Sequence, residues 1–394
     1  MHLDEIMAPL GAETFVRDYL GRQPLHLQGS PGKFQDVMNW DVLNRLLGMT
    51  TIWSAQSLVL VLDKEVIQPP AFCQPAPGRD GGTVLRPDPA KVKRYLAQGA
   101  TLVLNDIDQL TPELSAVARS LETALGGKVQ ANLYMSSKRK QAFRAHFDFH
   151  DVFAVHVMGE KTWMVFQGRA DHPIKHALFE GWPQERHEAA KGELWREVRL
   201  KPGDLLYLPR GQYHYALADD GACAHIAFGV TYPIGMDAVS YGFERLVADS
   251  VGRADLPRER SALRARLREI GQALAAVLSD ERAADDMLRF MTAYRWPREV
   301  FDLPGLVENA EERFRLKGTG LRLVSQGGRY GLLREGSRQA VEVPAAIQPQ
   351  LAWVLDRQGF ARQELLAAFP DQTPARLDQL LVDLRRMGVI EPTS

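Results

Sequence analysis

The chain has 394 residues, of which 45% are hydrophobic and 25% are charged, and these ordinary proportions exclude disorder as the default. The length predicts two or three domains. The 48 Lys and Arg residues nearly balance the 49 Asp and Glu residues, and this balance excludes a broad surface for coating nucleic acid.

Cysteine content and the N-terminal residues predict an intracellular protein. The two cysteines, Cys73 and Cys223, are too few for a disulfide framework and are typical of a reducing cytosol. The first residues carry acidic groups where a signal peptide has positive charge. The longest apolar runs fall far short of the ~20 residues that a membrane helix needs. We therefore expect a cytoplasmic protein with no membrane contact.

Residues 1–235 contain short β-rich runs between turn residues. Strands of this length, closed off by Gly, Pro and Asp, are typical of a sandwich or barrel. The runs are LVLVL from Leu58, TLVLN from Thr101, NLYM from Asn132, VFAVHV from Val152, WMVF from Trp163, LLYL from Leu205 and HIAFGV from His225. Residues 76–90, rich in Pro and Gly, are predicted to form a long surface loop.

Residues 236–310 change to a helical period. Apolar residues three and four positions apart share one face of a helix. The residues in this pattern are Leu263, Leu267, Ile270, Leu274 and Leu278. A second helix is predicted around residues 287–294. Such helices can pack on the β domain or on another subunit, and the sequence leaves both open.

Residues 311–394 are predicted to form short strands followed by helices. The strands are expected at 321–325 and 330–334. Thr373 and Pro374 suit the N-cap and first position of a helix. The apolar face of that helix is expected to contain Leu377, Leu380, Leu381, Leu384 and Met387. This order of elements favours a small winged-helix-like module.

The segment HFDFHD, residues 146–151, supplies candidate metal ligands. Alternate side chains of an extended strand share a face, so His146, Asp148 and His150 are expected on one side. Histidines in a strand also make ordinary hydrogen bonds. The segment alone therefore leaves a metal site and a structural role open.

A third histidine lies at the end of the segment GDLLYLPRGQYH, in which Gly203, Pro209 and His214 have five and four residues between them. That spacing is the second sequence motif of the cupin barrels. A tight turn, the strand LLYLP and a second turn at Arg210 and Gly211 are expected to present His214. A histidine placed there can meet a His-x-Asp pair on a neighbouring strand.

Together His146, Asp148 and His214 form a set of two histidines and one carboxylate. This set leaves three faces of an octahedral iron open and is typical of non-haem Fe(II) oxygenases. Two open positions suit the keto-acid end of 2-oxoglutarate, and the third suits O₂. Zinc binds the same donors, and His150 is a rival ligand because it shares the predicted face.

A 2-oxoglutarate site also needs a cation for the far carboxylate. Lys161 precedes the strand WMVF and is the candidate, although a solvated hairpin lysine is the alternative. Asn132 and Tyr134 share one face of NLYM and are able to donate hydrogen bonds to the same carboxylate.

These segments resemble the JmjC-type cupin oxygenases, most closely the ribosomal oxygenases. The similarity runs through NLYM, HFDFHDVFAVHVMGEKTW and PGDLLYLPRGQYH, and ETFVRDYLGRQPLHLQG is similar to the N-terminal region of that branch. It implies an α+β chain with a JmjC double-stranded β-helix, or jelly roll, as the catalytic domain over 1–235. A helical dimerisation segment would follow over 236–310 and a C-terminal winged-helix domain over 311–394.

The resemblance also implies roles for individual residues. His146, Asp148 and His214 would be the iron ligands, and the 2-oxoglutarate pocket would contain Lys161, Asn132, Tyr134 and His225. Two positions depart from the family. At His156 the family often has glutamine, and at His225 a small polar residue or Asn is common, so the identity of the hydroxylated residue is open.

The implied function is that of an Fe(II)-, 2-oxoglutarate- and O₂-dependent hydroxylase acting on an Arg or His of a ribosomal protein, as a homodimer. One alternative is the same chemistry on another protein or peptide, including N-methyl-lysine demethylation. Another is a cupin sensor with a DNA-binding winged helix. Residues 341–394 contain five Arg and no Lys against seven Asp and Glu, which argues against direct nucleic-acid binding.

Overall fold

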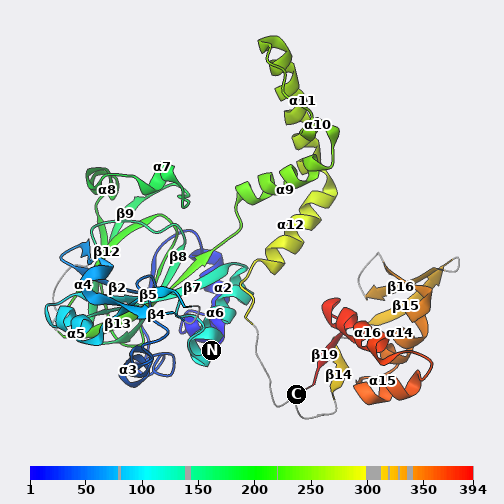
Figure 1. Ribbon diagram of the computed structural model, residues 1–394, viewed down its shortest axis with the longest axis horizontal. Helices are drawn as coiled ribbons and strands as arrows, with labels where there is room; N and C mark the ends of the chain where they lie inside the picture. Colours follow the sequence, from blue (N-terminus) through cyan, green and yellow to red (C-terminus); the bar gives the residue numbers. More distant parts are fainter. Residues whose placement is uncertain are drawn as a thin grey trace. The chain divides into compact units, whose positions relative to one another are not determined.

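The structure is a computed structural model that describes residues 1–78, 81–137, 143–219, 221–298, 312–317, 320–326, 329–334 and 340–393. It divides into two compact units, Met1–Arg298 and Glu299–Ser394 (Figure 1). The helices expected as a separate zone belong to the first unit. The expected boundary between residues 310 and 311 lies outside the described residues.

The first unit is built on an eight-stranded antiparallel sheet with the order β1-β11-β8-β13-β7-β6-β2-β3. Its strands are β1 (Leu25–Leu27), β2 (Leu58–Leu62), β3 (Glu65–Val66), β6 (Thr101–Leu104), β7 (Lys128–Ser136), β8 (Asp151–Met158), β11 (Leu205–Leu208) and β13 (Cys223–Thr231). Six of the seven β-rich runs predicted from the sequence are confirmed here.

A second sheet faces the first and contains the seventh predicted run. It has the order β10-β9-β12, with β9 (Lys161–Arg169), β10 (Leu194–Leu200) and β12 (Gln212–Ala218). One buried apolar cluster joins the two sheets: Val152, Ala154, Leu206 and Leu208 from the large sheet and Trp163, Val165, Val198 and Leu200 from the small one. Two antiparallel sheets sharing a core in this way are typical of a jelly roll.

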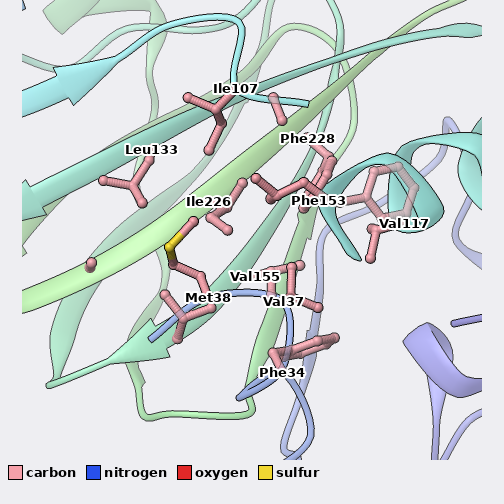
Figure 2. Packing of buried hydrophobic residues seen from close by; sticks show 14 of the residues in the cluster. Phe34, Val37, Met38, Ile107, Val117, Leu133, Phe153, Val155, Ile226 and Phe228 are labelled. Carbon is pink, nitrogen blue, oxygen red and sulfur yellow. The ribbon is translucent and has the colours of Figure 1, made fainter. Parts of the chain in front are cut away.

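The alternation of side chains along the central strands separates two environments. On β8, Val152 and Ala154 contact the small sheet, whereas Phe153 and Val155 lie in the main hydrophobic core. Figure 2 shows that core, where Phe153, Val155, Ile226 and Phe228 meet Phe34, Val37, Met38 and Val117. The polar residues of the opposite face are therefore left to line the space between the sheets.

Helices from the first part of the unit cover the outer face of the large sheet. Thr111 caps α6 by accepting a hydrogen bond from the backbone of Leu114, Pro112 opens the helix, and Gly126 ends it at a φ of 69°. The helices before the arm are α1 (Leu3–Met7), α2 (Ala12–Asp18), α3 (Trp40–Gly48), α4 (Pro69–Phe72), α5 (Pro89–Ala97), α6 (Pro112–Leu125), α7 (Ala177–Glu180) and α8 (Gln184–Ala190).

The prediction of a long loop over residues 76–90 was wrong. The strands β4 (Cys73–Pro77) and β5 (Thr83–Pro87) form an antiparallel hairpin, and α5 begins at Pro89. The described strands pair β4 only with β5. Prolines are tolerated on such edge strands because one side of the backbone needs no ladder hydrogen bond.

The helical arm of the first unit contains α9 (Gly235–Val247), α10 (Ser250–Arg253), α11 (Arg260–Ser279) and α12 (Glu281–Ala293). Both helices predicted from periodicity, around 263–278 and 287–294, are confirmed. Asp286 on α12 accepts hydrogen bonds of 2.6 Å from Tyr241 and Arg245 on α9. Within the described part of the chain, no helix is long and apolar enough to cross a membrane.

Arg298 anchors the chain after α12 to the jelly roll. Its side chain is only 3% exposed and donates to Glu122 on α6, to Asp108 and to the backbone oxygen of Val129 on β7. Burial alone would lower the pKa of Arg298, but the two carboxylates outweigh burial and raise it. The site is therefore a buried ionic cluster next to the strand that carries Asn132 and Tyr134.

We expect Arg298→Met to destabilise the protein by about 3–5 kcal/mol, because it leaves two buried carboxylates without their cation. Denaturant unfolding measures the change. Adding Glu122→Gln and Asp108→Asn to Arg298→Met is expected to restore part of the loss. An Arg298→Met variant as stable as the wild type would show that this cluster contributes nothing.

The second unit consists of two small sheets and three α-helices among its described residues. The first sheet pairs β14 (Arg313–Leu316) with β18 (Gly359–Ala361) and β19 (Ile390–Pro392), and the second contains β15 (Leu321–Gln326), β16 (Arg329–Arg334) and β17 (Val341–Val343). The helices are α14 (Gln348–Leu355), α15 (Arg362–Ala368) and α16 (Pro374–Arg386).

The predicted strands at 321 and 330 and the helix beginning at Pro374 are confirmed. Leu377, Leu380, Leu381 and Leu384 are buried in the core of the unit, as expected. Met387 is not: it ends the helix and is 44% exposed. The Thr373 side chain makes no capping hydrogen bond.

Candidate metal centre

Three predicted ligands, His146, Asp148 and His214, meet between the two sheets. Their ligand atoms all lie within 4.8 Å of one another. The Oδ2 atom of Asp148 is 3.5 Å from Nε2 of His214, and the two imidazole centroids are 4.5 Å apart. Within the described ranges, no second cluster of His, Cys, Asp and Glu has this arrangement.

The local backbone explains how the ligands meet. His214 lies on β12, and His146 forms an isolated antiparallel bridge with it through two backbone hydrogen bonds of 3.1 and 2.9 Å. The expectation of an extended strand through 146–150 was only partly correct. Beyond the bridge the chain bends at residues 149 and 150, and β8 begins at Asp151.

Hydrogen bonds fix the orientation of both imidazole rings. The Nδ1 atom of His146 lies 2.8 Å from the backbone oxygen of Arg144, and Nδ1 of His214 lies 2.9 Å from that of Gln212. A carbonyl only accepts, so each Nδ1 carries the proton and donates. Each Nε2 is therefore left with the lone pair that binds a metal.

The charges at the site suit a divalent cation. Burial, with the nearby imidazole of His146, lowers the pKa of His214 to about 4, so this ring is neutral at neutral pH. Burial would raise the pKa of Asp148, but the imidazoles of His214, His146 and His150 outweigh it and lower the pKa. Neutral imidazole and ionised carboxylate are the forms that coordinate metals.

His150 lies in the same cavity but outside the group of three. Its Nδ1 is 3.2 Å from the backbone oxygen of Asp151, and its ring lies flat against Gly229 on β13. A Cβ at position 229 would come within 2.7 Å of Cε1 of the ring. The structure thus places His150 as a wall of the cavity.

We expect Gly229→Ala to displace the His150 ring, to cost about 1–3 kcal/mol of stability through overpacking, and to leave metal affinity unchanged. Metal titration and denaturant unfolding on the same variant measure both effects. A loss of affinity as large as that of His146→Ala would identify His150 as a ligand.

The cavity around these residues has a volume of about 310 Å³. Both sheets contribute to it, and it contains every predicted site residue. Its lining consists of Gln130, Asn132, Tyr134, Phe143, His146, Asp148, His150, Val152, Lys161, Trp163, His214, Ala216, His225, Ala227 and Gly229.

Lys161 supplies a buried positive charge at the start of β9. Its residue is 5% exposed, and burial lowers its pKa. No carboxylate among the described residues forms an ion pair with it. A buried lysine without a protein counter-charge suits an anionic ligand.

Tyr134 and Asn132 lie on the same face of β7, as predicted. Burial, with the charge of Asp148, raises the pKa of Tyr134 to about 12, so its hydroxyl stays protonated and available as a donor. Asn132 Oδ1 accepts a hydrogen bond of 3.0 Å from the backbone of Asp106, which fixes the orientation of its amide.

His225 packs between two aromatic rings of the cavity. It stacks on Tyr134 at 5.0 Å and meets the edge of Trp163 at 5.1 Å. Burial, then the charge of Lys161, lowers its pKa well below the ordinary value, so it is neutral. Nδ1 of His225 and Nε1 of Trp163 have no hydrogen-bond partner within the described ranges.

Trp163 is a residue of the cavity that was not predicted from the sequence. It lies two positions after Lys161 on the same strand, so the alternation of β9 places both on the inner face. Lys161 together with the unpartnered groups of Trp163 and His225 fits a ligand with acceptor oxygens, as 2-oxoglutarate has. The imidazoles of His146 and His214 with the carboxylate of Asp148 fit Fe(II).

Comparison with known proteins agrees with this geometry. Residues 108–237 match the JmjC domain, a range that includes every site residue named above. Ribosomal oxygenase 2 of Bos taurus is 29% identical over 270 residues, which cover 65% of this chain and 54% of that protein. A bifunctional lysine-specific demethylase and histidyl-hydroxylase of Drosophila persimilis, NO66, is 22% identical over 57% of this chain and 31% of its own length.

A solved structure has the same fold. The X-ray structure of Escherichia coli ycfD is 16% identical, covers 98% of this chain and 99% of its own, and superposes with a TM-score of 0.51. The chain spans about a third to a half of the two curated relatives described above.

The fold and the site define a JmjC domain of the cupin type. Within that class, the chain is similar to the ribosomal oxygenases.

Proposed function

We propose that this protein is an Fe(II)- and 2-oxoglutarate-dependent protein hydroxylase. The observation that carries the proposal is the convergence of His146, Asp148 and His214 in one cavity with the buried Lys161. The group of three side chains suits a metal ion, and Lys161 suits the carboxylate of a co-substrate.

The residues of the cavity have separate roles in this proposal. When bound, ferrous ion and 2-oxoglutarate use O₂ to give succinate, CO₂ and a hydroxylated substrate. His146, Asp148 and His214 would hold the metal through two nitrogens and one carboxylate. Lys161 would pair with the far carboxylate of 2-oxoglutarate, and the hydroxyl of Tyr134 and the amide of Asn132 would donate to it.

We propose a ribosomal protein as the substrate, with an Arg or a His as the hydroxylated residue. The similarity to ribosomal oxygenase 2 supports the substrate class, and the similarity to NO66, a histidyl-hydroxylase, supports histidine as the hydroxylated residue. Mass spectrometry of ribosomal proteins, from cells with and without the chain, tests this. One peptide is expected to gain the mass of a single oxygen atom only when the chain is present.

The control is a cell that carries Asp148→Ala in place of the wild-type chain. It should lack the modified peptide, because the metal set is incomplete. If no ribosomal peptide gains oxygen but the purified protein still converts 2-oxoglutarate to succinate, the substrate class is wrong and the chemistry stands.

Lysine demethylation is a second candidate, because NO66 is described as both a demethylase and a hydroxylase. The two activities differ in product. Demethylation of a methylated peptide releases formaldehyde, whereas hydroxylation leaves a stable oxygen adduct. Formaldehyde from methylated but not from unmethylated peptides would favour demethylation.

We further propose that the helical arm, 236–310, mediates a homodimer. Met236, Val239, Phe243 and Val247 recur at three- and four-residue steps on α9 and are 42–63% exposed. Such a stripe suits an equivalent stripe of a second copy. Light scattering at micromolar concentration is expected to give a dimer, and Phe243→Glu is expected to give a monomer.

We propose that the catalytic domain extends over 1–235 and that 311–394 form a winged-helix domain. We also propose that the winged-helix domain does not bind nucleic acid directly and that the protein is cytoplasmic. The succession α14, β18, α15, α16 and β19 supports a winged helix. Acidic residues outnumber basic residues in 341–394, and this excess argues against the alternative function, a cupin sensor with a DNA-binding winged helix. A gel-shift titration with DNA at low salt tests the absence of nucleic-acid binding. Tight binding that weakens steeply as salt is added would contradict it.

A further inference from the structure

Asp151, the first residue of β8, is a buried carboxylate just after the metal-binding segment. It is 3% exposed and accepts two hydrogen bonds. Its Oδ2 accepts from the hydroxyl of Tyr207 on β11 at 2.6 Å, and its Oδ1 accepts from the backbone N–H of Arg210 at 2.7 Å. Asp151 lines no part of the cavity, so it is available for neither metal nor 2-oxoglutarate.

Arg210 belongs to the turn that presents His214. This turn connects β11 to β12, and Gly211 within it has a φ of 86°. A side chain at Gly211 would meet the backbone oxygen of Ala170 at 2.2 Å, so the turn has little room to relax. A shift of the turn would therefore pass directly to His214, four residues after Arg210.

Besides the ring contact of Phe147 with Tyr213, three hydrogen-bonded contacts join this turn and strand to the segment with the other two ligands and the start of β8. Two of them are backbone contacts: the bridge between His146 and His214, and a 3.0 Å hydrogen bond from the N–H of Gly211 to the oxygen of Asp148. The third is the hydrogen bond from the N–H of Arg210 to Asp151, and among these three hydrogen-bonded contacts it is the one that depends on a side chain.

The opposite side of the turn is held by Arg169 at the end of β9. Its Nε donates to the backbone oxygen of Arg210 at 2.8 Å, and its Nη1 donates to the oxygens of Gly21 and Arg22 at 3.0 and 3.1 Å. Gly21 in turn donates its N–H to the Tyr207 hydroxyl at 2.7 Å. The backbone of Arg210 is thus held on both sides: its N–H donates to Asp151, and its carbonyl oxygen accepts from Arg169.

We propose that Asp151 is a positioning residue for the metal centre: it holds the turn before His214 in the register that brings this imidazole to His146 and Asp148. Arg169 supports the same turn from the other side. The inference rests on the proposed metal site, but assigns a role to residues that touch neither metal nor co-substrate. Outer contacts of this kind orient ligands and affect metal affinity.

The test is a Co(II) titration of the full chain, followed by the visible absorption of the bound ion, which reports its coordination geometry. Asp151→Val removes both acceptors at similar size, and is expected to weaken Co(II) binding about 10- to 100-fold and to change the spectrum. Asp151→Asn keeps one oxygen for Arg210 and is expected to restore most of the affinity. Tyr207→Phe leaves the contact with Arg210 intact and is expected to bind Co(II) as the wild type does.

Asp204 provides a matched structural control. It is a buried carboxylate at the other end of β11, and it accepts hydrogen bonds from the N–H groups of Gly29 and Lys201, both at 3.0 Å. Asp204→Val is expected to destabilise the protein without changing the affinity or spectrum of Co(II). If Asp204→Val weakens binding as much as Asp151→Val, the effect is general loss of stability and the inference fails.

A milder variant keeps the inference testable if Asp151→Val does not fold. Arg169→Met alters an exposed side chain, and is expected to weaken Co(II) binding about 2- to 10-fold, the contribution of one hydrogen bond. Wild-type affinity and spectrum in Asp151→Val, or in Arg169→Met where Asp151→Val does not fold, would overturn the positioning role. A wild-type chain that fails to bind Co(II) would instead overturn the proposed metal site.

Discussion

Alanine at His146 or Asp148 is expected to abolish both Co(II) binding and the formation of succinate from 2-oxoglutarate. Each change removes one of three donors whose ligand atoms lie within 4.8 Å, and the loss should exceed the about 10- to 100-fold effect of outer contacts. The fold is expected to persist, because both residues are half-buried and lie outside the hydrophobic clusters. Metal titration, a succinate assay and circular dichroism measure the three quantities.

His150→Ala is the internal control for this prediction. It removes an imidazole from the same cavity and the same segment, but one that lies against Gly229 and outside the group of three. We expect metal affinity to stay near that of the wild type. The opposite ranking, with His150→Ala more damaging than His146→Ala, would mean that the ligand assignment is wrong.

The convergence of the three candidate ligands could be predicted from sequence because they lie in two recognisable motifs. The HFDFHD segment and the five- and four-residue intervals ending at His214 predict that His146, Asp148 and His214 meet, and they leave His150 as a rival ligand. The wall formed by His150 could not be predicted in the same way. His150 shares its expected face with the ligands, and only the bend at residues 149 and 150 and the space over Gly229 set its ring aside.

The same distinction applies to the fold. Strands such as β8 and β11 follow from runs of apolar residues between turns, so their positions could be predicted. The hairpin of β4 and β5 could not, because its prolines usually indicate a loop and its strands pair only with each other among the described residues. The contact of Asp151 with Arg210 joins residues 59 positions apart, and no local pattern reports it.

Lys161→Met is expected to change stability and co-substrate affinity in opposite directions. The wild-type ammonium group is buried without a carboxylate partner among the described residues, so removing it should raise the melting temperature of the ligand-free protein. The same change removes the proposed partner of the far carboxylate of 2-oxoglutarate. Losing one member of a buried charged pair costs about 2–5 kcal/mol, or about 30-fold to several thousand-fold in Kd.

Calorimetric titration of 2-oxoglutarate in the presence of Co(II), with melting curves at several pH values, measures both effects. Burial lowers the pKa of Lys161, so the charge destabilises the folded state most at low pH. That cost disappears as pH rises past the ordinary lysine value of 10.5, where the unfolded chain loses its proton too. The stability gained by Lys161→Met should therefore shrink as pH increases.

Thr162→Val is the matched control for Lys161→Met, because Thr162 is the next residue of β9 and donates to Asp219 at 3.2 Å instead of lining the cavity. Its Kd for 2-oxoglutarate should equal that of the wild type. Lys161→Arg keeps the charge and should recover part of the affinity lost in Lys161→Met. If Lys161→Met binds 2-oxoglutarate as the wild type does, Lys161 is not part of the co-substrate site. If Lys161→Met lowers the melting temperature of the ligand-free protein, Lys161 has a counter-charge in that state.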